Sequence, residues 1–156
     1  MVDRVLFSSK SDSWQTPKWL YDKLNSIWKI DLDPCTTIDN PLNVPNIYTQ
    51  RVSGLEHTWH GNVFVNPPYN REITKWLQKA IDELDKGNAK LVIFLLPVRT
   101  DTRWFHNYVY DDFIANFRRG VKHIWFIKGR LKFGNAKNTA PFPSMIVVLE
   151  KPTMKI

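Results

Sequence analysis

Cysteine and long apolar runs are the two clearest shortages in this sequence of 156 residues. The single cysteine, Cys35, excludes an intramolecular disulfide framework and a zinc site made of several cysteines, and we expect no bound metal. No stretch reaches the roughly 20 apolar residues that a membrane-spanning helix needs. The first residues also lack the apolar core of a signal peptide. We therefore expect a cytoplasmic protein with no membrane partner.

Acidic residues are missing from one long stretch, because no Asp or Glu occurs between Asp112 and Glu150. The whole chain carries 22 Lys and Arg against 15 Asp and Glu, which gives a formal net charge of +7. Basic side chains neutralise phosphates, and the aromatic side chains that alternate with them here can stack on bases. A solvated cationic face is the alternative interpretation, but the composition favours a nucleic-acid partner. The candidate contacts in this stretch are Arg118, Arg119, Lys128, Arg130, Lys132, Lys137 and Phe142.

The pattern of apolar residues predicts one domain over residues 1–156, with 1–11 as a loosely held tail. Thr16-Pro17 is typical of a helix start, with Thr16 as the N-cap. Helical spacing then predicts a core-facing stripe made of Trp19, Leu20, Leu24 and Trp28. We expect further helices at 72–84 and 100–110, a loop at 36–58, and strands at 29–33, 62–65, 91–96, 113–117, 124–127 and 145–149. This order predicts an α/β three-layer sandwich with a mainly parallel sheet and antiparallel C-terminal strands.

The tetrapeptide Asn66-Pro67-Pro68-Tyr69 directly follows the predicted strand at 62–65. In open α/β sheets, ligands bind beyond the carboxyl ends of the strands. The Asn66 side-chain oxygen and the Pro67 carbonyl can accept both hydrogens of a planar amino group and stabilise its pyramidal transition state. Tyr69 can stack on a base that is rotated out of a duplex. A simple proline turn is the alternative, but the context favours Asn66, Pro67, Pro68 and Tyr69 as catalytic residues.

Polar residues also follow two other predicted strands. Asp33-Pro34-Cys35 ends the strand at 29–33, and a carboxylate there can bind an ammonium group through a charge-assisted hydrogen bond. A capped strand end is the alternative interpretation. After the strand at 91–96, Arg99 and Thr100 are candidate nucleic-acid contacts, although Thr100 or Asp101 could equally cap the next helix.

Together these motifs resemble the small Dam-like family of phage- and prophage-encoded DNA N6-adenine methyltransferases. The resemblance extends from Asp12 to Leu149. It is carried by the segments Asp12-Ser13-Trp14-Gln15-Thr16-Pro17, Leu32-Asp33-Pro34-Cys35, Asn66-Pro67-Pro68-Tyr69, Arg99-Thr100-Asp101-Thr102, Trp104-Phe105-His106, Gly129-Arg130-Leu131-Lys132-Phe133 and Ala140-Pro141-Phe142-Pro143-Ser144. It implies a Rossmann-like methyltransferase fold, a bacteriophage origin with action in the host cytoplasm, S-adenosylmethionine as cofactor and double-stranded DNA as partner.

The resemblance also implies a cofactor site. The Gln15-Thr16-Pro17 motif would contact the methionine end of the cofactor, and Asp33 would meet its amino group. The implied cofactor-binding residues are Trp14, Gln15, Thr16, Pro17, Asp33, Pro34, Cys35 and Asn66. The sequence departs from the pattern in two places, because it has no glycine-rich loop after Asp33 and has Ser53 where an acid is expected before Gly54-Leu55. Possible substitutes for that acid, which could bind the cofactor adenosine, are Asp39 and Glu56.

These observations lead to the hypothesis that a monomer or homodimer methylates N6 of adenine in DNA. The same chemistry on RNA or on a protein glutamine amide is the alternative among enzymes. A cofactor-free nucleic-acid-binding module of the same fold is the alternative outside them. Either the loop at 36–58 or the segment at 118–144 would read the DNA, and we expect a short or relaxed recognition site.

Overall fold

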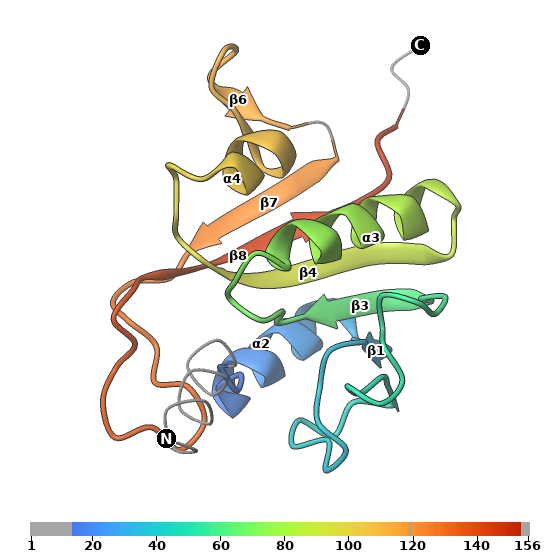
Figure 1. Cartoon of the computed structure of the whole chain (residues 1–156), viewed down its shortest axis with the longest axis vertical. Coiled ribbons are helices and arrows are strands. Elements are labelled where there is room, and N and C mark those ends of the chain that lie inside the picture. Colours follow the sequence, from blue (N-terminus) through green and yellow to red (C-terminus); the bar gives the residue numbers. More distant parts are fainter. Residues whose placement is uncertain (1–13, 119, 154–156) are drawn as a thin grey trace.

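The computed structural model describes residues 14–118 and 120–153, so the predicted tail and the motif residues Asp12, Ser13 and Arg119 lie outside the described residues. Six strands form the main sheet (Figure 1). In spatial order they are β2 (Asn46–Ile47), β1 (Leu32–Asp33), β3 (Gly61–Val65), β4 (Ala89–Pro97), β8 (Ser144–Leu149) and β7 (Val121–Phe126). The first four are parallel, whereas β8 is antiparallel to both β4 and β7. The predicted mainly parallel sheet with antiparallel C-terminal strands is confirmed.

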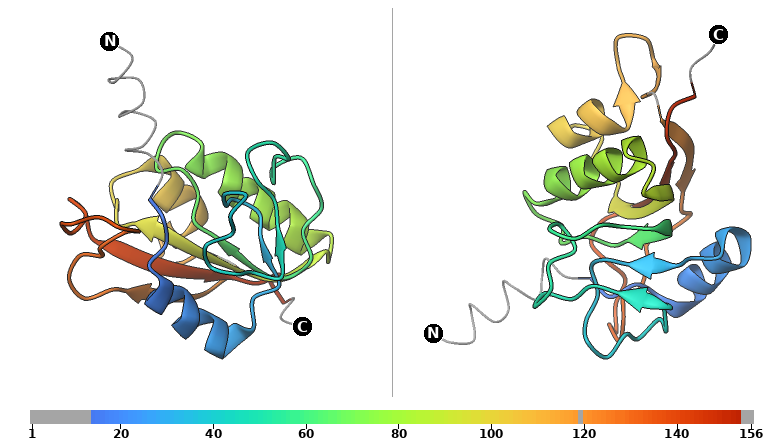
Figure 2. Two further views of the ribbon diagram at one scale, coloured as in Figure 1. Left: turned by 90° about the horizontal axis from the view of Figure 1, so that it is seen from below. Right: turned by 90° about the vertical axis from the view of Figure 1, so that its right-hand side faces the viewer.

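Helices cover both faces of this sheet and complete three layers (Figure 2). On one face lies α2 (Lys18–Trp28), and on the other lie α3 (Ile73–Asp85) and α4 (Arg103–Tyr108). The arrangement is the predicted Rossmann-like three-layer sandwich. None of the described helices has the length and apolar character needed to cross a membrane.

The buried stripe of α2 is narrower than the sequence predicts. Leu20, Tyr21 and Leu24 are buried against the sheet, but the Trp19 side chain is 55% exposed. Trp19 lies about 100° around the helix from Leu20, which places it outside the stripe centred on Leu20 and Leu24. The prediction that Trp19 faces the core is therefore wrong.

The core lies along the two central strands, β4 and β8. Every residue from Leu91 to Pro97 and from Ser144 to Leu149 is buried. Successive side chains of a strand point to opposite faces of the sheet, so the continuous apolar runs reflect burial on both faces. This confirms the two-sided burial predicted for the strand at 91–96.

The chain between α4 and β8 differs most from the prediction. Instead of a strand at 113–117, a small separate hairpin pairs β5 (Tyr110–Asp111) with β6 (Asn116–Phe117). The Phe113 amide donates to the Asp111 carboxylate at 3.1 Å, and Ala115 has a left-handed φ of 51°. These two features turn the chain where a strand was expected and leave Phe113 95% exposed. The following strand also begins earlier than predicted, at Val121.

Candidate functional site

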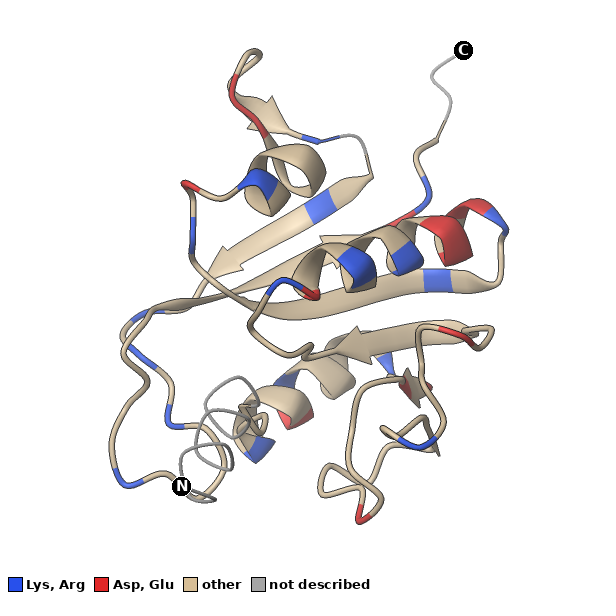
Figure 3. Cartoon of the chain, in the orientation of Figure 1, with Lys and Arg blue, Asp and Glu red and all other residues tan. Residues whose placement is uncertain are grey.

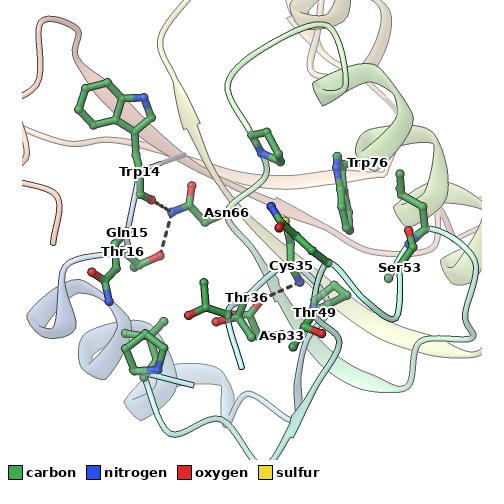
Figure 4. Close-up of a pocket in the computed structure, with 18 of the residues that line it drawn as sticks. Trp14, Gln15, Thr16, Asp33, Cys35, Thr36, Thr49, Ser53, Asn66 and Trp76 are labelled. Carbon is green, nitrogen blue, oxygen red and sulfur yellow. Dashed lines mark hydrogen bonds between the residues drawn. The ribbon is translucent and has the colours of Figure 1, made fainter. Parts of the chain in front are cut away.

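The carboxyl ends of the parallel strands β1, β2 and β3 meet at one edge of the sheet, where a cleft of about 510 Å³ opens (Figure 4). This volume is in the range of sites for small ligands and cofactors. The cleft brings together most of the predicted cofactor-binding residues, namely Trp14, Gln15, Thr16, Asp33, Pro34, Cys35 and Asn66. Pro17 does not line it, because this proline lies at the start of α2, where its carbonyl accepts the Leu20 and Tyr21 amides.

The Asn66 side chain is oriented by contacts to the segment before α2. Its Nδ2 donates to the Trp14 carbonyl and, at 3.0 Å, to the Thr16 hydroxyl. A carbonyl can only accept, so the amide must turn its nitrogen toward Trp14. The Asn66 Oδ1 atom then faces the other way, and it is buried without a hydrogen-bond partner among the described residues. A buried acceptor without a partner is costly, and a ligand that carries an N–H donor would satisfy it.

Thr16 does not cap α2 as predicted. The helix begins after Pro17, and no side chain caps its first turn. Thr16 is buried instead beside the cleft, where its hydroxyl accepts from Asn66. The error has a physical origin, because a threonine before a proline looks the same in sequence whether its hydroxyl turns to the helix or to a neighbouring loop.

Asp33 is the carboxylate at the end of β1, and only 3% of its surface is exposed. Burial raises its pKa from 3.8 to about 7, although the Cys35 amide, which donates to Oδ1 at 3.0 Å, acts in the opposite direction. None of the ion pairs among the described residues involves Asp33. A desolvated carboxylate without a counter-charge is suited to an ammonium ligand. The site chemistry therefore fits the amino group of a methionine-like cofactor.

Gly54 packs closely against the turn that follows Asp33. A Cβ at Gly54 would lie 2.1 Å from the Pro34 carbonyl oxygen, so the 49–55 segment can approach this turn only with glycine there. Ser53, Gly54 and Leu55 all line the cleft. Of the two possible acids named for the adenosine, Asp39 lines the cleft, whereas Glu56 is exposed outside it.

Several lining residues were not predicted. They include Thr36, Thr37, Thr49, Gln50, Glu72 and Trp76. Four of them come from the 36–58 region, where the two-residue strand β2 was missed because it is too short to show an alternating pattern. The other two belong to the start of α3 and its first turns, whose apolar pattern indicated only a core helix.

Tyr69 is less accessible than its predicted stacking role requires. It is 5% exposed, and its hydroxyl donates to the Leu95 carbonyl at 3.2 Å. Its ring contacts Phe142 and Phe133 edge-on, with centroid distances of 5.5 and 6.2 Å. Trp14 contacts the same two phenylalanines. We refer to Trp14, Tyr69, Phe133 and Phe142 as the aromatic cluster.

The basic stretch divides between two ends of the molecule. Lys128, Arg130, Lys132 and Lys137 are exposed in the loop after β7, and Figure 3 shows blue positions spread along this loop. Because β8 is antiparallel to both β4 and β7, β7 is parallel to β4, and the loop leaves the sheet at the cleft edge. Its Gly134 amide donates to the Gln15 carbonyl at 2.8 Å. The remaining described member, Arg118, precedes β7 and lies roughly 20 Å away along the strand. It pairs with Asp111 at 3.1 Å and donates to the His106 carbonyl.

The two residues predicted after β4 have different surroundings. The Arg99 guanidinium lies 6.0 Å from the Phe142 ring centre, beside the aromatic cluster. Thr100 is exposed, and its carbonyl lies 2.6 Å from His106 Nε2. Neither Thr100 nor Asp101 caps α4, because Thr102 does so by accepting from the Phe105 amide.

Comparisons with known proteins show the fold and the family of this chain. The fold is similar to the crystal structure of a candidate RNA methyltransferase from Pyrococcus horikoshii, with a TM-score of 0.57 and 14% sequence identity over 91% of this chain and 88% of that chain. No curated protein matches the sequence. The family model for DNA N-6-adenine-methyltransferase (Dam) matches residues 5–155, nearly the whole chain. The chain is therefore a methyltransferase, and it belongs to the DNA N-6-adenine-methyltransferase (Dam) family.

Proposed function

We propose that the protein transfers a methyl group from S-adenosylmethionine to N6 of adenine in double-stranded DNA. The observation that carries this proposal is the buried Oδ1 of Asn66, which has no hydrogen-bond partner among the described residues and belongs to the same cleft as Asp33. An oriented acceptor of this kind suits an amino group as its target, and the family is consistent with adenine.

The chemistry that this site must perform is activation of a weak nucleophile. The lone pair of an adenine amino group is delocalised into the ring, so the group is planar and reacts slowly. Asn66 Oδ1 and the Pro67 carbonyl would each accept one of its hydrogens. Two fixed acceptors favour the pyramidal nitrogen of the transition state, and this electrostatic stabilisation requires no general base. The proton that the methylated nitrogen loses would pass to solvent water.

The cofactor supplies an electrophilic methyl group on a sulfonium sulfur. Asp33 would hold its ammonium, and burial makes that pairing stronger than it would be in water. Thr16 and Trp14 would fix Asn66, as they do through its amide nitrogen. The protein thus has an acceptor for the target amino group and a carboxylate for the cofactor in one cleft.

The DNA backbone would lie against the loop after β7. Lys128, Arg130, Lys132 and Lys137 are exposed there without a neighbouring acid in sequence, and their loop contacts the segment that orients Asn66. The target adenine would leave the duplex to reach Asn66. For it to stack on Tyr69, the aromatic cluster must open, because Phe142 and Phe133 lie against that ring.

The experiment that tests the proposal is transfer of labelled methyl groups from S-adenosylmethionine to unmethylated genomic DNA, followed by digestion to nucleosides. N6-methyladenine is the expected product. RNA and a glutamine-containing peptide serve as competing substrates, since Asn66 Oδ1 could hold any planar amino group. Folded protein that binds the cofactor but labels only RNA or peptide would overturn the choice of substrate. Failure to bind the cofactor would favour a non-catalytic nucleic-acid-binding module.

A further inference from the structure

The Trp76 indole N–H is a second buried polar group in the cleft that has no partner. Trp76 is 6% exposed, and its Nε1 makes no hydrogen bond within the described structure. The indole stacks on Trp59, with a centroid distance of 6.3 Å and an interplanar angle of 22°. The neighbouring Trp59 N–H, by contrast, donates to the Gly54 carbonyl at 2.7 Å. The same aromatic pair therefore contains one satisfied donor and one unsatisfied donor.

Trp76 lies at the opposite side of the cleft from Asn66. In Figure 4, Trp14, Thr16 and Asn66 are on one side, Trp76 and Ser53 are on the other, and Cys35 and Asp33 lie between them. If Asp33 and Asn66 mark the methionine and methyl positions, as the proposed function requires, the rest of the cofactor extends toward Trp76. That remaining part is the adenosine.

Glu72, an exposed residue, provides an acceptor in the same cleft as this donor. It also lines the cleft, and it precedes Trp76 by one helical turn at the start of α3, where its carbonyl accepts the Trp76 amide at 3.2 Å. Side chains four residues apart lie on the same face of a helix. The ionised carboxylate can only accept and the indole N–H can only donate. The pair therefore offers a ligand one acceptor and one donor, and these roles cannot be exchanged.

We infer that Trp76 and Glu72 read the adenine ring of the cofactor, with the indole N–H donating to a ring nitrogen and the carboxylate accepting from the exocyclic amino group. This inference rests on the proposed function. Adenine presents a ring-nitrogen acceptor beside an amino donor on each of its two polar edges, which matches this pair. Hypoxanthine has a carbonyl in place of the amino group, and that oxygen would face the Glu72 carboxylate. Adenosine recognition is thus assigned to the helix after the Asn66–Tyr69 motif rather than to an acid at position 53.

The test compares the binding of two probes, S-adenosylhomocysteine and S-inosylhomocysteine, by calorimetry. The wild-type protein should bind the adenosine compound at least roughly tenfold more tightly, because the other presents a carbonyl oxygen to the Glu72 carboxylate beside the buried Trp76 N–H. Glu72→Gln, whose amide can donate to a carbonyl, should lower that preference by roughly tenfold. Trp76→Phe should weaken binding of the adenosine compound by a similar factor.

Two control variants separate recognition from structure. Glu56→Gln removes an exposed acid outside the cleft, and Trp19→Phe removes an exposed indole N–H on α2, also outside the cleft. Both should keep the wild-type ratio between the two probes. Equal binding of the probes, or an unchanged ratio in Glu72→Gln, would overturn the inference while leaving the proposed function intact. Binding of neither probe would contradict the proposed function, and the inference would fall with it.

Discussion

The Thr16 hydroxyl accepts a hydrogen bond from the Asn66 side chain at 3.0 Å, although 50 positions separate the two residues in sequence. Together with the Trp14 carbonyl, Thr16 determines which atom of the Asn66 amide is free. The segment before α2 therefore lines the cleft and also orients the Asn66 amide so that Oδ1 is free.

Thr16→Val should impair methyl transfer more than cofactor binding. Valine keeps the shape of threonine but removes the hydroxyl, so Asn66 keeps only its Trp14 contact and Oδ1 is held less firmly. We expect kcat to fall roughly tenfold. Steady-state kinetics and calorimetry on the same preparation check this, with Thr16→Ser as the matched control that restores the hydroxyl. A rise in KM for the cofactor with unchanged kcat would show that Thr16 only lines the cleft.

Asp33→Asn should abolish cofactor binding and yet stabilise the protein without its cofactor. Burial raises the pKa of Asp33 from 3.8 to about 7, so between these pH values the folded chain keeps a proton that the unfolded chain releases. The free energy of unfolding therefore falls as pH rises through this window and stays lower above it. Asparagine can still accept from Cys35 through Oδ1 but carries no charge.

Urea unfolding without cofactor measures this effect. At pH 8 the Asp33→Asn protein should be more stable than wild type by up to ~4 kcal/mol. Near pH 4 the two proteins should unfold at the same urea concentration. A variant that is less stable than wild type at pH 8 would show that the Asp33 charge is already compensated in the protein.

Cofactor affinity should weaken as pH falls below about 7, where Asp33 takes up a proton in the unliganded protein. The ammonium of the cofactor needs the carboxylate form, so Kd for S-adenosylhomocysteine should rise by about tenfold per pH unit below that point. Calorimetry in buffers of different ionisation enthalpy should also detect a proton released on binding at pH 6. A Kd that stays constant from pH 5.5 to 8 would exclude this pairing.

Charge removal should affect DNA binding at one end of β7 only. Lys132→Gln should weaken DNA binding and lower the slope of log affinity against log salt concentration by about one. Arg118→Gln is the matched control, because Arg118 is already paired with Asp111 and lies away from the cleft edge. Fluorescence anisotropy with labelled duplex DNA measures both slopes. Equal losses in the two variants would indicate a non-specific cationic surface.

The sequence predicted the central sheet and many of the residues that line the cleft for a common physical reason. Strands buried on both faces need continuous apolar runs, as at Leu91 to Leu96. Polar residues that follow such strands, such as Asp33 and Asn66, must then gather at one edge of a parallel sheet. In these segments the apolar pattern of the sequence agrees with the position of the strand in the sheet, so the pattern alone is enough to predict that position.

The side of the cleft that contains Trp76 could not be predicted in this way. Trp76 fits the apolar stripe of α3, and nothing in that stripe distinguishes an indole whose N–H lacks a partner. Thr16 was likewise assigned to the helix because its contact with Asn66 spans 50 positions. Long-range contacts of this kind depend on how the elements pack. The exposure of Trp19 also depends on packing, because only one side of α2 is buried against the sheet.

The most direct test of the account is the rate of N6-methyladenine formation by the Asn66→Ala variant, measured together with its affinity for S-adenosylhomocysteine. The account predicts that wild type forms N6-methyladenine in DNA. It predicts that Asn66→Ala loses at least about a hundredfold in kcat, the loss seen when one oriented transition-state contact is removed, while Kd changes only a few-fold. A variant that methylates DNA at the wild-type rate would contradict the central role of Asn66 Oδ1. The same holds for a wild-type protein that binds the cofactor and leaves the adenines of DNA unmethylated.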